Sequence, residues 1–256
     1  MINKAVQVLV TAGDTFEAID EVRRITHMAT GRLGSLIADE FARQGADVTY
    51  LCGRYSLRPT KNVKQIVEIT GVMELQEAME RLLDSSSFDA LIHSMAVSDY
   101  TVRGITTESD LLSELKAAIT QISSEESLSS AVERAIRQAL YTASGKISSD
   151  LETLTVFMDR APKVISIVKQ KQPEIVLVGF KLLAGVSESE LLDAAKHQMQ
   201  NSGSDFVLAN DLDSIAGDEH CGMLIDKNGI IDRPKTKQEI AESIAGAVLS
   251  RIHGGE

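Results

Sequence analysis

The sequence predicts an α/β protein with a mainly parallel sheet and an antiparallel hairpin at one edge. Apolar extended runs alternate with helical patterns through the first half of the chain, and the alternation returns after residue 162. Such alternation is typical of βαβ units. Near the end, Asn228 and Gly229 stand between two extended runs, which is a strong short-range signal for a β-hairpin.

The first predicted unit is a strand, a loop, a helix and a second strand. The apolar run "VQVLVTA" stops at Gly13 and is typical of a buried strand. Apolar residues then recur at helical spacing from Leu33 through Ile37 to Phe41, and Gly45 stands where a left-handed C-cap belongs. The extended run "ADVTYLC" follows at once and gives the second strand.

The middle of the chain begins with predicted strands over 63–69 and 89–100, separated by a helix over 73–84. From Arg103 to Ser149 the composition changes to Ser, Glu and Ala, with few large apolar residues. Such a segment buries too little apolar surface for a core of its own. We therefore expect one domain over residues 1–256 with a flexible flap or insertion at 103–149, which contains a helix from Ala131 to Tyr141.

The last part of the chain returns to ordered α/β patterning. A helix is expected from Pro162 to Gln170, because proline suits a first helical turn. The buried strands "EIVLVGF" and "DFVLAND" flank a helix that a capping box of Ser187 and Glu190 opens. An amphipathic helix over 237–251 closes the fold.

Composition excludes several classes of partner. The 37 acidic residues against 26 Lys and Arg give a net charge of -11, which is unfavourable for binding nucleic acid. No apolar run approaches the roughly 20 residues of a membrane span, and no cleavage signal follows the first residues. Cys52 and Cys221 fit neither a zinc site nor a disulfide scaffold. We expect a cytoplasmic protein with no nucleic-acid or membrane partner.

Four predicted strand ends carry unusual polar residues in the stretches "TAGDT", "AVSDY", "GFKL" and "AND". Ligands of open parallel sheets bind beyond the carboxyl ends of strands, where helix amino termini present free N–H groups. Asp99 is suited there to bind magnesium or accept hydrogen bonds. Lys181 needs a partner or ligand at the end of an apolar strand, unless it reaches back to solvent. The strand ends therefore predict a ligand site.

Several of these residues also have a simpler structural interpretation. In "VRRITHMATGRLG", Thr30, Gly31 and Gly34 either cradle a phosphate or only cap and pack a helix. Their spacing lacks the full dinucleotide fingerprint, which argues against a nicotinamide dehydrogenase. Lys146 in "SGKISSD" is either a mobile phosphate clamp or a solvated lysine.

Two further polar sites are ambiguous from sequence alone. Asn210 and Asp211 can cap a helix or a turn as well as contact a ligand. His93 is more typical of a hydrogen-bonded core histidine than of a catalytic base.

The stretches "VTAGDT", "VRRITHMATGRLG", "HSMAVSDY", "GKISSD", "LVGFKL" and "FVLAND" occur in this order. Together they resemble the phosphopantothenate-cysteine ligases, also called phosphopantothenoylcysteine synthetases, in their stand-alone form. The resemblance runs from residue 6 to about 240 and is weakest over 103–143. It implies a three-layer Rossmann-like (ribokinase-like) domain that acts as a homodimer.

The resemblance also implies a reaction of coenzyme A biosynthesis. The family activates 4'-phosphopantothenate with CTP or ATP and Mg2+ as an acyl nucleotidylate, which the amine of cysteine then attacks. By position, Lys146 and His27 match catalytic residues, and Asp99 matches a metal ligand. The nucleotide and phosphate contacts that the resemblance implies are Gly13, Thr15, Thr30, Gly31, Gly34, Ala96, Asp99, Phe180, Lys181 and Asn210.

This chain departs from the family pattern at two positions. Asp14 stands where the family usually has glycine, and His27 stands where it has asparagine. An amide both donates and accepts hydrogen bonds, whereas a histidine does so in another geometry. Two alternatives therefore stay open: a catalytically impaired nucleotide-binding or regulatory homologue, and an amide ligase for another carboxylate substrate.

Overall fold

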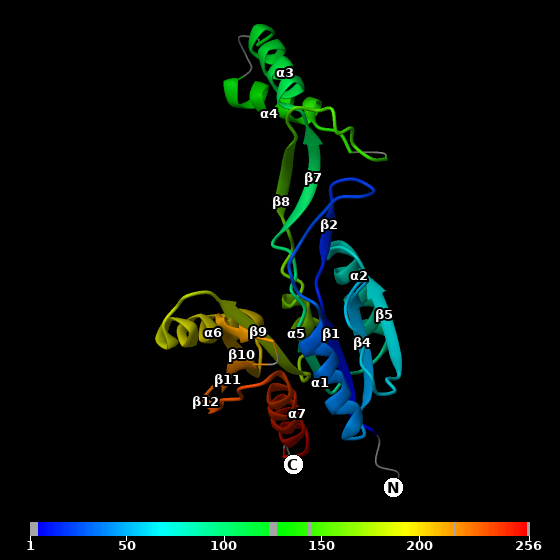
Figure 1. Cartoon of the computed structure of the whole chain (residues 1–256), viewed down its shortest axis with the longest axis vertical. Helices are drawn as coiled ribbons and strands as arrows, with labels where there is room; N and C mark the ends of the chain where they lie inside the picture. The colour runs from blue at the N-terminus through cyan, green and yellow to red at the C-terminus, as the bar shows by residue number, and fades with distance from the viewer. Residues whose placement is uncertain (1–4, 123–126, 143–144, 218, 255–256) are drawn as a thin grey trace. The chain divides into compact units, whose positions relative to one another are not determined.

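The computed structural model describes residues 5–122, 127–142, 145–217 and 219–254, which form two compact units (Figure 1). Unit 1 comprises Met1–Thr15, His27–Val97 and Lys163–Glu256, and unit 2 comprises Phe16–Thr26 and Ser98–Pro162. Unit 2 thus contains the whole predicted insertion at 103–149 together with flanking residues and a segment from near the amino terminus. The flexibility of that insertion stays a prediction.

Unit 1 is built on an eight-stranded sheet in the order β12-β11-β10-β9-β6-β1-β4-β5. The six strands β5, β4, β1, β6, β9 and β10 are neighbours in this order and pair in parallel. The pairs β10–β11 and β11–β12 are antiparallel. The predicted fold class and edge hairpin are confirmed. The strands are β1 Gln7–Ala12, β4 Asp47–Gly53, β5 Gln65–Ile69, β6 Ala90–His93, β9 Val176–Leu183, β10 Phe206–Ala216, β11 Glu219–Asp226 and β12 Gly229–Asp232.

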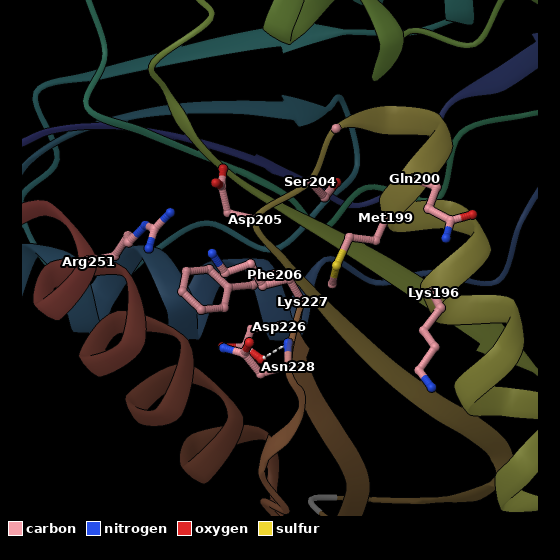
Figure 2. A pocket seen from close by; sticks show the side chains of 11 residues that line it. Lys196, Met199, Gln200, Ser204, Asp205, Phe206, Asp226, Lys227, Asn228 and Arg251 are labelled. Carbon is pink, nitrogen blue, oxygen red and sulfur yellow. Dashed lines mark hydrogen bonds between the residues drawn. The ribbon is translucent and has the colours of Figure 1, made fainter. Parts of the chain in front are cut away.

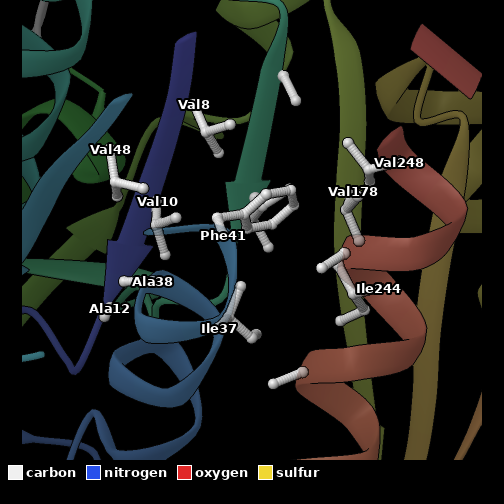
Figure 3. Packing of buried hydrophobic residues seen from close by; sticks show 14 of the residues in the cluster. Val8, Val10, Ala12, Ile37, Ala38, Phe41, Val48, Val178, Ile244 and Val248 are labelled. Carbon is white, nitrogen blue, oxygen red and sulfur yellow. The ribbon is translucent and has the colours of Figure 1, made fainter. Parts of the chain in front are cut away.

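Helices cover both faces of this sheet. Figure 3 shows Ile37 and Phe41 of one helix and Ile244 and Val248 of another in the aliphatic core on one face. Leu191 and Ala195 pack against the other face. No helix in the described part of the chain is long and apolar enough to cross a bilayer. The helices of unit 1 are α1 Arg32–Arg43, α2 Val72–Ser85, α5 Ser166–Lys171, α6 Glu188–Ser202 and α7 Lys237–His253.

Local signals predicted several element boundaries correctly. Ser187 and Glu190 form the predicted capping box at the start of α6. Gly45 has a φ of 87° just beyond α1, as expected of a left-handed cap. Two boundaries in unit 1 were wrong, and the helix predicted from Ala131 to Tyr141 runs from Leu128 to Ala139. α5 begins at Ser166 rather than at Pro162, because Ala161 N still donates to the Asp99 carbonyl 2.9 Å away and keeps the chain extended there.

The second wrong boundary is that of the central strand, which was predicted over 89–100. Strand β6 ends at His93, and the chain then enters the turn that contains Ala96. Alternating and small residues such as those in "SMAVSDY" extend equally well in a strand or a loop, so periodicity alone does not locate this end.

Unit 2 contains two short antiparallel pairs and two helices. β2 (Phe16–Ala18) pairs with β3 (Arg24–Thr26), and β7 (Tyr100–Thr106) pairs with β8 (Thr155–Arg160). Helices α3 (Glu108–Thr120) and α4 (Leu128–Ala139) lie side by side.

The segment that we expected to lack a core has a small one made of alanines. Ala118 of α3 packs with Ala131 and Ala135 of α4, and all three side chains are buried. The four-residue spacing of Ala131 and Ala135 places them on one helix face, where small side chains allow two helices to approach closely. A scan for large apolar residues does not detect a core of this kind.

Candidate functional site

The turns after β1 and β6 meet at the carboxyl edge of the sheet of unit 1. Strand β1 lies between β4 and β6. The chain therefore forms β4 on one side of β1 and later forms β6 on the other side. Ala96 N donates to the Gly13 carbonyl at 2.8 Å, and Thr15 N donates to the Ala96 carbonyl at 3.1 Å. Three predicted contact residues are therefore joined where ligands of doubly wound sheets bind.

The amino terminus of α1 lies beside these turns. Its N-cap, Gly31, has a φ of 77° and provides no side-chain cap, and the first turn contains no acidic residue. The N–H groups of a first helical turn lack helical partners and carry partial positive charge. A Cβ on Gly31 would lie 3.2 Å from Gly13 N, so the two glycine turns are in contact. Their backbone can receive an anion, such as a phosphate.

Packing alone accounts for Gly34. A Cβ at this position would lie 2.4 Å from the Cβ of Ala12 on β1, so helix and strand approach closely through the missing side chain. Thr30 contributes to the same helix start, because its Oγ1 accepts a bond from Arg32 N at 3.3 Å. Within this one motif, Gly34 therefore serves packing, whereas Gly31 offers its backbone to a phosphate.

The strand-end residues of β9 and β10 point to two faces of the sheet. Phe180 packs against the core cluster that α1 and α7 share, and Leu208, two residues before Asn210, belongs to the same cluster. Since strand side chains alternate, Asn210, which is 5% exposed, shares this face and Lys181 lies on the opposite one. The structure thus brings Phe180 and Asn210 to the face of α1 but does not bring Lys181 there.

Asp211 fits the structural alternative, that of a turn-holding residue. Its carboxylate accepts backbone N–H groups from Gly185 at 3.2 Å, Val186 at 3.1 Å and Asp213 at 2.9 Å. The bond from Asp213 N and those from the other two lower the pKa of Asp211 below its ordinary value, against the effect of burial. The Asp211 carboxylate therefore accepts hydrogen bonds from the backbone and has a structural role in this turn.

The pockets of unit 1 do not all lie at this edge. A pocket of about 380 Å³ is lined by Asn210, in the middle of β10, and by Arg233 and Lys235. Figure 2 shows another, of about 450 Å³, lined by Phe206, at the start of β10, and by Arg251. Only the first of these two contains a predicted contact residue, so the pocket in Figure 2 is separate from the predicted site.

Two ionisable groups near the strand ends belong to the core. His93 hydrogen-bonds Thr11 Oγ1 through Nδ1 at 2.9 Å, and burial lowers its pKa to about 4. The prediction of a hydrogen-bonded core histidine is confirmed. Burial likewise raises the pKa of the Cys52 thiol to about 11. Both cysteines are free, as expected, and Cys52 is a poor nucleophile because it stays protonated at neutral pH.

Lys146 and Asp99 belong to unit 2. The Lys146 side chain is exposed, but the next residue, Ile147, is buried. Ile147 N donates to Asp20 Oδ2 at 3.1 Å, and Arg23 Nη2 donates to the Ile147 carbonyl at 3.3 Å. The segment that carries Lys146 is therefore anchored to the β2–β3 turn.

Asp20 holds this segment in place but was not predicted from the sequence. Besides Ile147, it accepts the N–H groups of Val22 at 2.8 Å and Arg23 at 2.6 Å, so one carboxylate joins the turn to the lysine segment. Burial alone would raise the pKa of Asp20, but the three backbone donors and the Arg23 guanidinium lower it below the ordinary value of 3.8. An aspartate bonded two residues ahead is an Asx turn, a local signal that could have identified part of this role.

We predict that Asp20→Asn releases the lysine segment. An amide offers one acceptor oxygen and turns an NH2 group toward backbone donors. Hydrogen exchange of the Ile147 amide should become about tenfold faster or more, since its acceptor is lost or weakened. Asp211→Asn, which alters a similar carboxylate in unit 1, should leave Ile147 unchanged. Unchanged exchange in Asp20→Asn would contradict this role.

Acid should produce the same release in the unaltered protein. Because the pKa of Asp20 is lowered in the folded state, its contribution is complete above the ordinary value of 3.8 and is lost as the pH falls through the folded pKa.

The two departures, Asp14 and His27, both belong to unit 1. The Asp14 backbone bridges to Ala96 in the turn after β1. His27 follows β3 directly and is exposed. No group of three or more His, Cys, Asp or Glu side chains among the described residues is arranged to hold a metal ion.

Comparison with known proteins identifies related sequences across nearly the whole chain. The family model for the DNA/pantothenate metabolism flavoprotein C-terminal domain matches residues 3–111 and 105–252. The coenzyme A biosynthesis bifunctional protein CoaBC of Thermococcus kodakarensis is 33% identical over 93% of this chain and 49% of its own length. That of Methanocaldococcus jannaschii is 27% identical over 96% of this chain and 51% of its own length. The chain thus spans about half the length of these relatives.

Solved structures agree with the fold. The crystal structure of the DNA/pantothenate metabolism flavoprotein from Streptococcus pneumoniae is 36% identical, with a TM-score of 0.79, and the match covers 96% of this chain and all of that one. The C-terminal domain of a CoaBC protein is 19% identical, with a TM-score of 0.68 over 98% of this chain and 97% of that one. At this identity, the second match supports the Rossmann-like fold alone.

Proposed function

Because the chain belongs to the family of the DNA/pantothenate metabolism flavoprotein C-terminal domain, we propose that it is a phosphopantothenate-cysteine ligase of coenzyme A biosynthesis. The observation that carries this proposal is the family match across nearly the whole chain. The name of the bifunctional relatives supports the pathway, and the glycine turns at the carboxyl edge of the sheet support a phosphorylated ligand.

The proposed reaction makes an amide in two steps. A carboxylate oxygen of 4'-phosphopantothenate attacks the α-phosphorus of CTP or ATP, and pyrophosphate leaves. The amine of cysteine then attacks the acyl carbon, loses a proton and displaces the nucleoside monophosphate. A carboxylate resists direct attack by an amine until its oxygen becomes part of a good leaving group. The chain must therefore position the reactants and neutralise phosphate charge.

We assign roles to the residues that the resemblance implies. The backbone of Gly13 and Gly31, with the first turn of α1, receives phosphoryl oxygens. Phe180 and Asn210 contact the nucleotide from their shared face, and Lys146 supplies a mobile positive charge. Lys181 has weaker support, because it lies on the other face. The further assignments are His27 for the acyl intermediate and Thr15, Thr30 and Ala96 for walls of the phosphate site, whereas Gly34 is left with its packing role.

Magnesium fits this site only as a companion of the nucleotide. The described residues contain no cluster of three acidic, histidine or cysteine ligands, so a cage made of protein side chains alone does not fit. Mg2+ commonly keeps several waters and takes one or two carboxylates together with substrate phosphates. Asp99 is the carboxylate that we assign to it. The proposal also includes a homodimer in the cytoplasm, as the resemblance implies.

An assay of the purified chain tests the proposal. With 4'-phosphopantothenate, cysteine and either MgCTP or MgATP, we expect one pyrophosphate for each amide formed, and none of the amide when any substrate is omitted. Absence of both products from folded protein would contradict the proposal. Stabilisation by nucleotide without turnover would instead favour an impaired or regulatory homologue, to which Asp14 and His27 point. Turnover with another carboxylate only would favour the other alternative.

A further inference from the structure

A buried hydroxyl without a hydrogen bond lies beside the two glycine turns. Ser56 follows β4, is 7% exposed, and its Oγ has no partner among the described residues. Most buried polar side-chain atoms in proteins are hydrogen-bonded, and an unpaired one destabilises the folded state. Alanine would avoid this penalty at the same position. An unpaired hydroxyl here therefore requires an explanation.

The side chain of Ser56 occupies the space that three glycines leave open. A Cβ on Gly13 would lie 1.6 Å from Ser56 Oγ, and one on Gly53 would lie 2.9 Å from it. A Cβ on Gly31 would lie 2.9 Å from Ser56 Cβ. Ser56 is thus wedged between the turn after β1, the end of β4 and the start of α1.

Backbone and side-chain bonds fix the Ser56 turn in this place. Ser56 N donates to the Gly53 carbonyl at 2.9 Å, and Leu57 N donates to the Thr30 carbonyl at 2.9 Å. On the other side, Tyr50 Oη donates to the Leu57 carbonyl at 2.8 Å. The Ser56 hydroxyl hydrogen can still rotate about the Cβ–Oγ bond while the turn stays in place.

The first turn of α1 supplies the second feature of an anion site. Its N-cap is the same Gly31 that contacts Ser56 and provides no side-chain cap, and the turn contains no acidic residue. Arg32 N donates to Thr30 Oγ1, and the N–H groups of Leu33 and Gly34 follow it in the turn. An anion at this terminus would bring acceptor oxygens next to a hydroxyl that lacks one. Hydrogen bonds to charged acceptors are stronger than those between neutral groups.

We propose that Ser56 is a positioning residue of the phosphate site, which holds the two glycine turns together and donates its hydroxyl to a phosphoryl oxygen once ligand binds. This inference rests on the proposed function for the identity of the ligand. The phosphoryl group comes either from 4'-phosphopantothenate or from the nucleotide. The unpaired hydroxyl is then a cost of the free protein that ligand binding removes.

Ser56→Ala tests the inference through two effects of opposite sign. The melting temperature of the free protein should rise by about 2–4 °C, because the unpaired hydroxyl is gone. The stabilisation by ligand should fall, because the dissociation constant of the phosphoryl ligand that reaches Ser56 should rise about tenfold. Pyrophosphate, MgCTP, MgATP and 4'-phosphopantothenate are added separately, so the affected probe identifies the source. KM for that substrate should rise about tenfold while kcat stays within about twofold.

Ser204→Ala is the matched control. Ser204 is also buried, at 5% exposed, but its Oγ is 2.7 Å from the Oγ of Ser202, so its removal should lower the melting temperature and leave every ligand response unchanged. If Ser56→Ala behaves like this control, the inference is wrong although the proposed function stands. If no probe stabilises the unaltered protein, both fail. Ser56→Gly repeats the measurement should the alanine variant not fold.

Discussion

Lys146→Ala should lower kcat of the proposed ligase by about 100- to 1000-fold, the range observed when one donor to developing charge is removed. The lysine side chain is exposed in unit 2, so the melting temperature should change little. Its ammonium group is the positive charge that we assign to the phosphates, in a protein whose net charge of -11 otherwise repels them. Steady-state release of pyrophosphate and thermal unfolding of the same preparation measure both quantities.

Lys116→Ala provides the control for Lys146→Ala. Lys116 lies on α3 of the same unit and carries the same charge, but no motif includes it. Its loss should change kcat by less than about twofold, since isolated surface charges are largely screened. Lys146→Arg should recover only part of the activity, because a planar guanidinium does not replace a compact ammonium. Turnover of Lys146→Ala within a few fold of the unaltered protein would remove this residue from the mechanism.

The sheet and its helices were predictable because their signals are local. Apolar runs, the capping box at Ser187 and the glycine after α1 each lie within a few residues of the feature that they specify. The start of α5 was not predictable in this way, since it depends on the bond between Ala161 and Asp99, which are far apart in sequence. Strand-end motifs predicted a site for a different reason, because the carboxyl ends of parallel strands share one edge of a sheet.

The residues that the sequence analysis missed make contacts between distant segments. Asp20 bonds Ile147 across 127 positions, and neither residue type signals the pairing. Ser56 lies within the stretch "YSL", which contains no motif, and its role becomes visible only in the packing with Gly13 and Gly31. The side of the sheet on which Lys181 lies also depends on tertiary packing, because the packing of Phe180 fixes which side of β9 meets α1. Pattern gives the type of each element, and packing decides which side chains meet.

Gly13→Ala should be among the most destabilising single substitutions in unit 1. Gly13 has a φ of 83°, where an L-residue costs about 1–2 kcal/mol, and its Cβ would lie 1.6 Å from Ser56 Oγ. Overpacking of a buried site costs a further 1–3 kcal/mol or so. The sum of about 2–5 kcal/mol corresponds to a fall in melting temperature of roughly 4–20 °C. Thermal unfolding monitored by circular dichroism measures it.

Two further variants separate the backbone cost from the clash. Gly45 has a φ of 87° and no atom within 4 Å of its would-be Cβ, so Gly45→Ala should lose only the backbone contribution of about 1–2 kcal/mol. Adding Ser56→Gly to Gly13→Ala should restore the part that is due to the clash, because the Oγ that meets the new methyl group is removed. Equal losses for Gly13→Ala and Gly45→Ala, with no recovery in the double variant, would mean that Ser56 does not require glycine at position 13.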